Sequence, residues 1–510
     1  MALVMRAAAA PRSCRRPASF ALRPGEGRTA ARMFAAVFFI MCAYYMVKPL
    51  REGWIAVSAI GGLSRLEIKA YSSLVQSLLL LALVGAYARL AARCTARALL
   101  RRSACACAAA LLAFWIAQPD FLFVAVPGLG IVFYLWVGLF GVFVVAQCWT
   151  IATDLYADDH GRRLLPLVAV GGTAGAAVGS WLYGVLAGLG PGSAHVILLG
   201  AVAPLLAAAG LAPTAARGRV GRHCGAGRGS AASLRRLAGD RFVLAAGLLA
   251  LLLSWAATNG ENLLFQIVQD GIARTMSAGG DVAALARARA ATTAFYGDFY
   301  LWTNLGALAA QLLVASRLLK RGGLAAIIFV LPLLALLASA IAALAPVLAI
   351  LKWVKIAEQA ADHSLNHTAR QVLWLPADAE TKIVAKPAVD SLCVRLGDGL
   401  AALTVLASTH LGGHATAVLI VVNVVLTVLW LAAAYVVVRE HGCLVARRAA
   451  AAAATARSFA AAARRAADTA ARGAGALLTA PARTWDRVAA WRLDLLPIGR
   501  GHSPPNALAA

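Results

Sequence analysis

Four charged residues interrupt the apolar segment 383–408, namely Lys386, Asp390, Arg395 and Asp398. A charge at the centre of a bilayer-spanning helix costs roughly 2.5 to 3.5 kcal/mol, so each of these residues requires a partner charge, water or a ligand. Lysine and arginine bind phosphate through charge-assisted hydrogen bonds, and the planar guanidinium group can bind it in a bidentate manner. These residue types therefore predict one wall of an anion site.

Other apolar segments also contain charged and amide side chains. They are Lys48, Arg51 and Glu52 in 34–56; Arg89 in 70–92; Asn259, Glu261, Asn262 and Gln266 in 241–268; Asp298, Asn304 and Gln311 in 292–316; and Lys352, Lys355 and Glu358 in 346–366. Any one of them could be half of an internal ion pair or a cation that reaches the membrane interface. The set occurs in both halves of the chain, and its cations outnumber the nearby acids, so it predicts a cavity that attracts anions.

The composition of the chain places these residues in a membrane protein. Of 510 residues, 61% are hydrophobic and 14% are charged, and the mean hydropathy is +0.76. A soluble globular protein has no use for so much apolar surface. The net charge of +26 could indicate a nucleic-acid binder. However, the basic residues gather in short loops between apolar segments and at the two ends, which is typical of residues that set membrane topology.

Segments of about 20 apolar residues are long enough to cross the hydrocarbon core as helices. Twelve such segments lie between polar breaks, at 34–56, 70–92, 99–118, 121–150, 163–188, 194–212, 241–268, 292–316, 323–345, 346–366, 383–408 and 413–438. The widest basic loop follows the sixth. The predicted fold class is an all-α polytopic membrane protein with twelve transmembrane helices in two six-helix halves. This is the major-facilitator-like arrangement, in which two halves rock about a site near the bilayer midplane.

Composition divides the chain into five parts. They are a basic amino-terminal tail (1–32), an amino-terminal half (33–212), a basic linker (213–240), a carboxyl-terminal half (241–438) and an Ala/Arg-rich tail (439–510). The first part has the composition of a transit peptide or of a cytoplasmic tail. The Ala/Arg/Gly bias of the chain indicates a GC-rich bacterial genome, which favours the tail. The last part is expected to be disordered or to lie on the membrane as a basic amphipathic helix.

The positive-inside rule gives the expected orientation. With the amino terminus in the cytoplasm, the inside loops contain Arg93 to Arg102; Arg162 and Arg163; Arg217 to Arg241; Arg317 to Arg321; and Arg370 to Lys386. The outside loops 187–193 and 410–414 contain neither lysine nor arginine, whereas the outside segment 271–291 is an exception with three arginines. We expect a multi-pass protein of the bacterial inner membrane with both termini in the cytoplasm.

Motifs that would indicate an enzyme are weak. GGTAGAAVG (171–179) is rich in glycine but lacks the Gly-Lys-Ser/Thr ending of a phosphate loop, and its small residues favour close helix packing. HLGGH (410–414) lacks the acidic and third-ligand context of a zinc site. The nine cysteines are scattered and form no disulfide framework. We therefore expect no catalytic residues, no metal and no cofactor.

Three stretches resemble the ATP/ADP translocases, the nucleoside tri-/diphosphate exchange transporters of plastids and intracellular bacteria. Residues 44–54 resemble the family's Tyr…Arg-Pro-Leu-Arg-Asp run. Residues 149–182 resemble its loop between helices four and five, with Arg162 and Arg163 on the family's Lys-Arg pair. Residues 368–403 contain LPAD, VAKPAVD and RLG, which resemble three consecutive elements of the family.

The resemblance implies roles for single residues. Lys386 falls on a lysine that contacts phosphate, Arg89 on a helix-two lysine and Glu261 on a helix-seven glutamate. Two positions depart from the family: His160 replaces a glutamate, and Asp398 replaces a lysine. An acid in place of a lysine weakens the binding of a polyphosphate, so Asp398 argues against strict ATP/ADP exchange.

The leading hypothesis is therefore an alternating-access exchanger of nucleotides or another phosphorylated anion. The expected substrate ligands are Lys48, Arg51, Arg89, Asn259, Glu261, Lys386, Asp390 and Arg395, and the expected gating or coupling residues are Asp154, Arg162, Arg163, Asp298 and Asp398. One alternative is a proton-coupled permease with Glu261, Asp298 or Asp390 as the proton carrier. Another is a membrane scaffold or sensor that does not transport. The expected partners are a small anionic substrate and membrane lipids, without nucleic acid, and the chain is expected to be a monomer.

Overall fold

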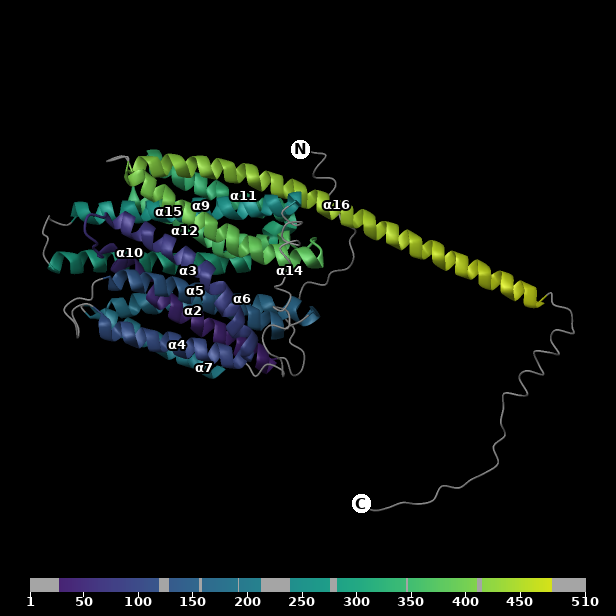
Figure 1. The fold of residues 1–510 in the computed structure, drawn as a ribbon, viewed down its shortest axis with the longest axis horizontal. Coiled ribbons are helices and arrows are strands. Elements are labelled where there is room, and N and C mark those ends of the chain that lie inside the picture. Colours follow the sequence, from purple (N-terminus) through teal and green to yellow (C-terminus); the bar gives the residue numbers. More distant parts are fainter. Residues whose placement is uncertain are drawn as a thin grey trace, which may run out of the picture. The chain divides into compact units, whose positions relative to one another are not determined.

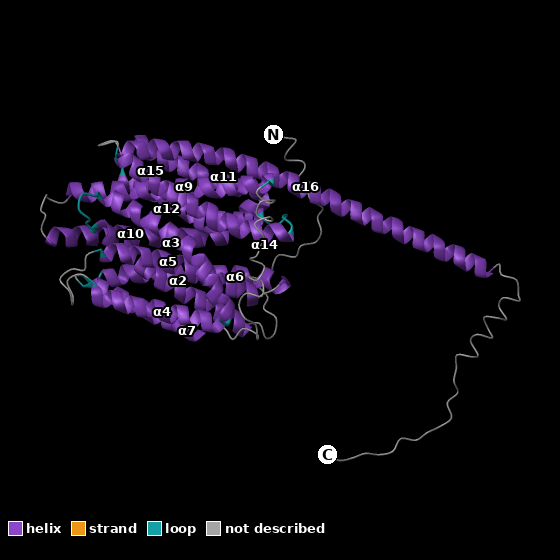
Figure 2. Cartoon of the chain, in the orientation of Figure 1, coloured by secondary structure: helices purple, strands orange, loops and turns teal. Residues whose placement is uncertain are grey.

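The computed structural model describes residues 27–118, 128–155, 158–190, 192–211, 239–275, 282–344, 347–410 and 415–478. Every secondary-structure element in these ranges is a helix (Figure 2). The all-α prediction is therefore confirmed for the described part of the chain. The expected linker 213–240 lies outside it except for its last two residues, as do residues 1–26 of the expected amino-terminal tail.

The helices before the linker form what we call the amino-terminal group. They are α2 (Gly27–Ala56), α3 (Arg65–Arg93), α4 (Ala96–Ala117), α5 (Leu129–Leu155), α6 (Asp158–Ala187) and α7 (Ser193–Leu211). Apolar side chains from these helices pack into one core, with Met33, Ile40 and Phe133 among its fully buried members. Figure 1 shows α2 between its neighbours in this group.

The helices after the linker form the carboxyl-terminal group. They are α9 (Arg241–Thr275), α10 (Val282–Ala309), α11 (Ala315–Leu344), α12 (Leu348–Ala361), α13 (His367–Leu373), α14 (Ala379–Ala388), α15 (Val394–Thr409) and α16 (Ala415–Leu478). Three π-helical segments connect helices of this group, η2 (Ala310–Val314), η3 (Asp362–Asn366) and η4 (Val389–Cys393). A second core is built from both groups and includes Ile55, Phe265 and Phe299.

Ten helices in the described ranges are long and apolar enough to cross a membrane. One of the ten, Ala284–Leu344, has 61 residues, about three times what a single crossing needs. It contains Gly323, whose φ of 66° lies in the left-handed region and breaks the helix between the two segments expected there. The stretch formed by α12, η3 and α13 is not among the ten. The multi-pass class is thus confirmed, and the number of twelve stays a prediction.

Helix α3 begins five residues before the expected segment 70–92. Ser64 and Glu67 form a capping box: the Ser64 amide donates to the Glu67 carboxylate at 2.7 Å, and the Glu67 amide donates to Ser64 Oγ at 3.2 Å. This reciprocal pair satisfies two amides that a helix start leaves without partners. Lys69 therefore lies inside the helix, where the sequence reading had placed it in a loop.

Helices α2 and α6 pack with their backbones in close contact. A Cβ atom at Gly175 would overlap the carbonyl oxygen of Phe38, and one at Gly179 would overlap that of Cys42. The glycines belong to GGTAGAAVG, so the prediction that this motif serves helix packing is confirmed. Because no side chain separates the two backbones, α2 and α6 are held at a fixed distance.

The chain divides into two compact units, residues 1–442 and residues 443–510. Within the second unit, residues 443–478 are helical, and the side chains described there are exposed apart from the half-buried Leu444. This region was expected to be disordered or to form a surface helix, and the helix is what the structure describes. Residues 479–510 lie outside the described ranges.

Candidate functional site

The first feature of the site is an aromatic cage around Lys48 of α2. The Lys48 ammonium lies 4.1 Å from the ring centroid of Tyr300 on α10, 5.0 Å from that of Tyr45 and 5.8 Å from that of Tyr44. Among the described residues, no carboxylate lies within ion-pair distance of this ammonium. The tyrosine faces stabilise the cation without neutralising it. Lys48 is therefore a half-buried positive charge that can still bind an anion.

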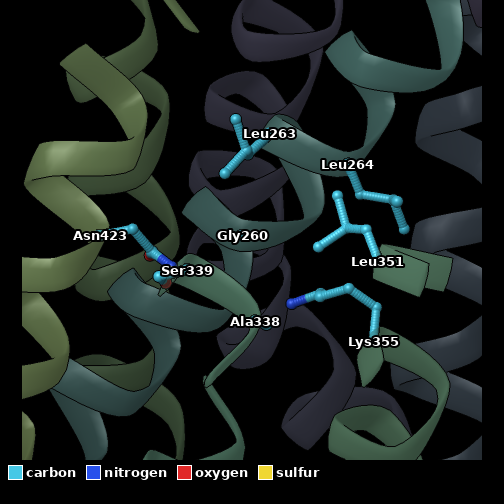
Figure 3. A pocket seen from close by; sticks show the side chains of 8 residues that line it. All are labelled: Gly260, Leu263, Leu264, Ala338, Ser339, Leu351, Lys355 and Asn423. Atoms are coloured by element: carbon cyan, nitrogen blue, oxygen red, sulfur yellow. The ribbon is translucent and has the colours of Figure 1, made fainter. Parts of the chain in front are cut away.

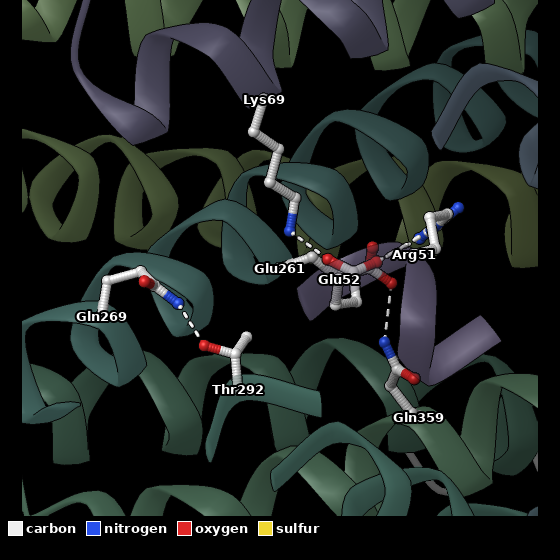
Figure 4. Close-up of polar contacts among 7 residues, drawn as sticks. All are labelled: Arg51, Glu52, Lys69, Glu261, Gln269, Thr292 and Gln359. Atoms are coloured by element: carbon white, nitrogen blue, oxygen red, sulfur yellow. Dashed lines mark hydrogen bonds and ion pairs between the residues drawn. The ribbon is translucent and has the colours of Figure 1, made fainter. Parts of the chain in front are cut away.

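The second feature is a buried ion triad one turn along the same helix (Figure 4). Glu52 of α2 accepts hydrogen bonds from Arg51 at 2.5 Å and from Lys69 of α3 at 3.0 Å. Arg51 also lies 4.6 Å from the ring of Tyr134, and Lys69 lies 4.1 Å from the ring of Phe265 on α9. One acid thus serves two cations, so the triad retains a net positive charge in the core.

Glu261 and Asn259 of α9 have different environments. Glu261 is exposed and accepts a 2.6 Å hydrogen bond from Gln359 of α12 (Figure 4). Asn259 is fully buried and donates to the Leu419 carbonyl at 3.2 Å and to Asn423 at 3.4 Å. Glu261 is therefore accessible to a ligand, whereas Asn259 bonds to α16 within the carboxyl-terminal group.

A third cluster surrounds Asp390 in η4. Arg370 of α13 donates to Asp390 at 2.6 Å, and the Lys386 ammonium lies 3.7 Å from the same carboxylate. Lys386 also donates to Gln371 at 3.2 Å. Lys386 lies in the last turn of α14, which begins at Ala379, and at the start of the apolar helix Ala385–Thr409. Two cations again share one acid, and the side chains of the three residues are about a third exposed or less.

A fourth cluster holds Asp398 of α15. Its carboxylate accepts from Arg395 at 2.7 Å, from Ser254 at 2.5 Å and from Thr258 at 2.9 Å. Arg395 is therefore paired with the residue that was expected to weaken anion binding. The two hydroxyls belong to α9, so Asp398 also links α15 to α9.

Local pairs neutralise several other charges that the sequence singled out. Lys355 and Glu358 form a buried pair at 2.8 Å, and Lys352 pairs with Asp298. The surplus of cations is therefore smaller than the sequence suggested. It resides in the two-to-one clusters around Glu52 and Asp390 and in Lys48.

The structure places the remaining expected residues as follows. Arg89 lies in α3 and is exposed. Asp154 lies in α5, and Arg162 and Arg163 lie in α6, but their side chains are outside the described part. Their expected roles stay predictions.

A small cavity lies within the carboxyl-terminal group (Figure 3). Its lining residues come from α9, α11, α12 and α16, and they include Gly260, Ser339, Lys355 and Asn423. A Cβ at Gly260 would lie 2.9 Å from the Lys355 ammonium, so the glycine makes room for this cation. None of the expected substrate ligands lines the cavity, and Lys355 is already paired with Glu358. We assign it to packing.

Polar contacts between the two groups occur at the end of the bundle where α2 ends and α3 begins. Thr409 of α15 donates to Glu67 of α3 at 3.1 Å, and Arg65 of α3 donates to Gln269 of α9 at 3.4 Å. At the same end, a Cβ at Gly53 would overlap the hydroxyl of Thr293 on α10. These contacts hold the groups together at this end, which we call the α2–α3 end.

The sequence reading missed three residues that the structure brings to these clusters. Lys69 completes the triad around Glu52, and the signal that places it in a helix is the capping box at Ser64 and Glu67. The others are His363 and His367, which lie at and directly after the end of the expected segment 346–366, beyond Lys352 and Lys355.

Comparisons with known proteins agree with this picture. Residues 326–441 match a family model described as TLC ATP/ADP transporter. This segment contains the third of the three resembling stretches, so the resemblance is confirmed there. The likeness of residues 44–54 and 149–182 stays a prediction. No curated protein matches the chain.

Solved transporter structures share the fold. A POT family transporter in complex with a thioalcohol-conjugated peptide is 13% identical with a TM-score of 0.54, over 79% of this chain and 96% of that one. An inward-facing, unoccupied bacterial homologue of the human lysosomal transporter Spinster is 12% identical with a TM-score of 0.52, over 82% and 99%. A mutant of the nucleoside transporter NupG is 15% identical with a TM-score of 0.52, over 79% and 99%. At these identities the likeness shows the fold alone. The described helices thus share the fold of these transporters, and residues 326–441 match the ATP/ADP transporter model.

Proposed function

We propose that the protein exchanges nucleotides, or related phosphorylated anions, across the membrane. The observation that carries this proposal is the cage of Lys48, a cation that lacks a carboxylate partner among the described residues and is held by tyrosines on α2 and α10. An anion bound there contacts both groups of helices at once. The family match of residues 326–441 supports a nucleotide as this anion.

The ion triad gives the site a way to respond to the anion. Arg51 and Lys69 share Glu52, so each is only partly neutralised. A phosphate close to Lys48 would attract Arg51, its neighbour one turn further along α2. Binding energy from such a contact favours whichever state of the transporter allows it, which is how a substrate drives alternating access.

The kind of membrane and the orientation of the protein in it are part of the same proposal. We place the protein in a bacterial inner membrane with both termini in the cytoplasm, because the basic loops follow that orientation. The α2–α3 end then faces outward. Substrate exchange requires the contacts at this end to open in one half of the cycle.

Uptake by reconstituted vesicles tests the proposal. Proteoliposomes that are loaded with ADP should take up labelled ATP, and empty proteoliposomes should not. Lys48→Met should reduce the uptake at least tenfold, since a lost charge-assisted hydrogen bond to phosphate weakens binding by about that factor. The matched control is Lys320→Met, at an exposed position of α11. Uptake that does not depend on internal nucleotide would overturn the exchange mechanism.

A proton-coupled permease remains a second candidate because of Glu261. Its carboxylate is exposed, and among the described residues only the neutral Gln359 bonds to it. A carboxylate without a cationic partner can exchange a proton with the cavity. In that case an uncoupler that collapses the proton gradient should abolish uptake, and Glu261→Gln should remove the response to the uncoupler. Uptake by a pure exchanger should not respond to the uncoupler.

A further inference from the structure

Two histidines lie at the π-helical turn between α12 and α13. Helix α12 ends at Ala361, η3 covers Asp362–Asn366, and α13 begins at His367. His363 lies within the π-helical turn and His367 directly follows it, and both side chains are exposed. A π-helical turn inserts an extra residue at a cost in stability, and such turns are frequent at functional sites.

His363 faces the interior of the bundle. Its Nδ1 donates a hydrogen bond to the Gln359 carbonyl at 2.8 Å, which leaves Nε2 directed away from its own helix. The charged groups that face it are Lys48 of α2, Glu261 of α9 and its neighbour Asp362. Since Lys48 and Glu261 come from different groups of helices, the imidazole lies between the groups and does not face lipid.

His367 lies on the same path, closer to the second cationic cluster. Its ring centroid is 5.8 Å from that of Trp149 on α5, so it also meets the amino-terminal group. The charged groups that face it are Arg370 of its own helix, Lys386 of α14, Asp362 and His363. The two imidazoles therefore connect the surroundings of Lys48 with those of Lys386.

The acids near the imidazoles are few. Asp362 accepts a 2.7 Å hydrogen bond from Asn366, and Glu261 accepts one from Gln359. Lysine and arginine supply the other charges that face the two rings. A protonated imidazole here adds a positive charge and a second N–H donor to a path that already favours anions.

We infer that His363 and His367 are phosphate ligands of the transport path, and that they make the protein bind its anion more tightly as the pH falls. This inference rests on the proposed function, because it assigns further ligands to the same site. Neutral His363 already uses its one N–H on the Gln359 carbonyl, so only its protonated ring offers phosphate a donor, at Nε2, together with a charge. Protonated His367 gains a second donor and a charge. The gain in affinity should therefore appear as the pH falls and the imidazoles take up protons.

Calorimetric titration of the purified full-length protein in detergent tests the inference. ADP is titrated at pH 7.5 and pH 6.0 into the wild type, the double variant His363→Gln/His367→Gln and the control His441→Gln, whose histidine lies on α16. We expect the ratio of Kd at pH 7.5 to Kd at pH 6.0 to be about tenfold larger for the wild type and the control than for the double variant. Titration of the ADP phosphates is common to all three proteins and cancels in this comparison. Equal ratios in wild type and double variant would overturn the inference.

Two further arms separate the possible failures. If the double variant has a lowered Tm without ligand, His367→Gln alone replaces it, because the described contacts of His367 are with a ring and with charges at longer range. If the wild type binds no ADP, the proposed nucleotide function fails, and inorganic pyrophosphate is titrated in the same way. A histidine-dependent ratio with pyrophosphate would support the phosphate ligands without nucleotide recognition. Absence of binding to both ligands would overturn the inference as well.

Discussion

Lys69 of α3 donates a 3.0 Å hydrogen bond to Glu52 of α2, and both side chains are almost fully buried. The two residues are 17 positions apart, and the chain turns back between them. Arg51 occupies the other oxygen of the same carboxylate. Glu52 holds the two basic side chains together in the core, because its removal would leave both of them buried without an acidic partner.

Removal of Lys69 should destabilise the protein. Lys69→Met leaves Glu52 with Arg51 alone and leaves one carboxylate oxygen buried without a partner. A lost hydrogen bond to a buried charged group costs about 1.5 to 3 kcal/mol, so the Tm of the purified protein should fall. Lys69→Met/Glu52→Gln should lower the Tm further, because Arg51 is then buried without a counter-charge. A Tm for the single variant equal to that of Lys320→Met would contradict this account of the triad.

The glycines of α6 should differ sharply in their tolerance of a methyl group. Gly179→Ala places a Cβ against the Cys42 carbonyl, and overpacking of this kind costs about 1 to 3 kcal/mol. Gly184→Ala on the same helix meets nothing within 4 Å and should be neutral or slightly stabilising, because alanine favours helix over glycine. Thermal unfolding of both variants in detergent measures the difference. Equal Tm values would show that α2 and α6 can move apart.

Two lysines should separate stability from function. Lys355→Met leaves Glu358 buried without its cation, at a cost of about 3 to 5 kcal/mol. Lys48→Met leaves no carboxylate behind and should change the Tm little, yet it should abolish nucleotide binding. Thermal shifts with and without ADP compare the two variants, since a ligand that binds the folded protein must stabilise it. A strong destabilisation by Lys48→Met would mean that the cage serves the fold.

A cross-link at the α2–α3 end should stop transport. Glu67 and Thr409 belong to different groups and share a 3.1 Å hydrogen bond. With cysteine at both positions, a short bifunctional thiol reagent should join the groups and block uptake. A cleavable linker should restore uptake after reduction. Each single cysteine variant serves as the control for the native cysteines, and full activity of the cross-linked protein would rule out opening at this end.

Much of the fold could be predicted because membrane helices follow from local composition. The expected segment 194–212 corresponds to Ser193–Leu211, and 163–188 lies within Asp158–Ala187 apart from one residue. Hydropathy alone determines such segments. It could not place the start of α3, which depends on the capping box at Ser64, nor the π-helical turns, which depend on tertiary contacts.

The site was less predictable because its partners are distant in sequence. Asp398 looked like an acid in the wall of a cavity, but hydroxyls of Ser254 and Thr258, more than a hundred positions away, hold it together with Arg395. In the same way, Arg370 forms an ion pair with Asp390, 20 positions away, and so neutralises that acid. Residue types therefore predicted a cationic site, and the folded chain shows which of the described cations are paired with acids.

The close contact of α2 with α6 has a mechanical consequence. Helix α2 carries Lys48 and Arg51, and α6 begins in the stretch that contains Arg162 and Arg163. Since backbone meets backbone at Gly175 and Gly179, no compliant side chain absorbs movement between the two helices. The two helices should therefore move together, so a displacement of α6 should also displace the helix that carries Lys48.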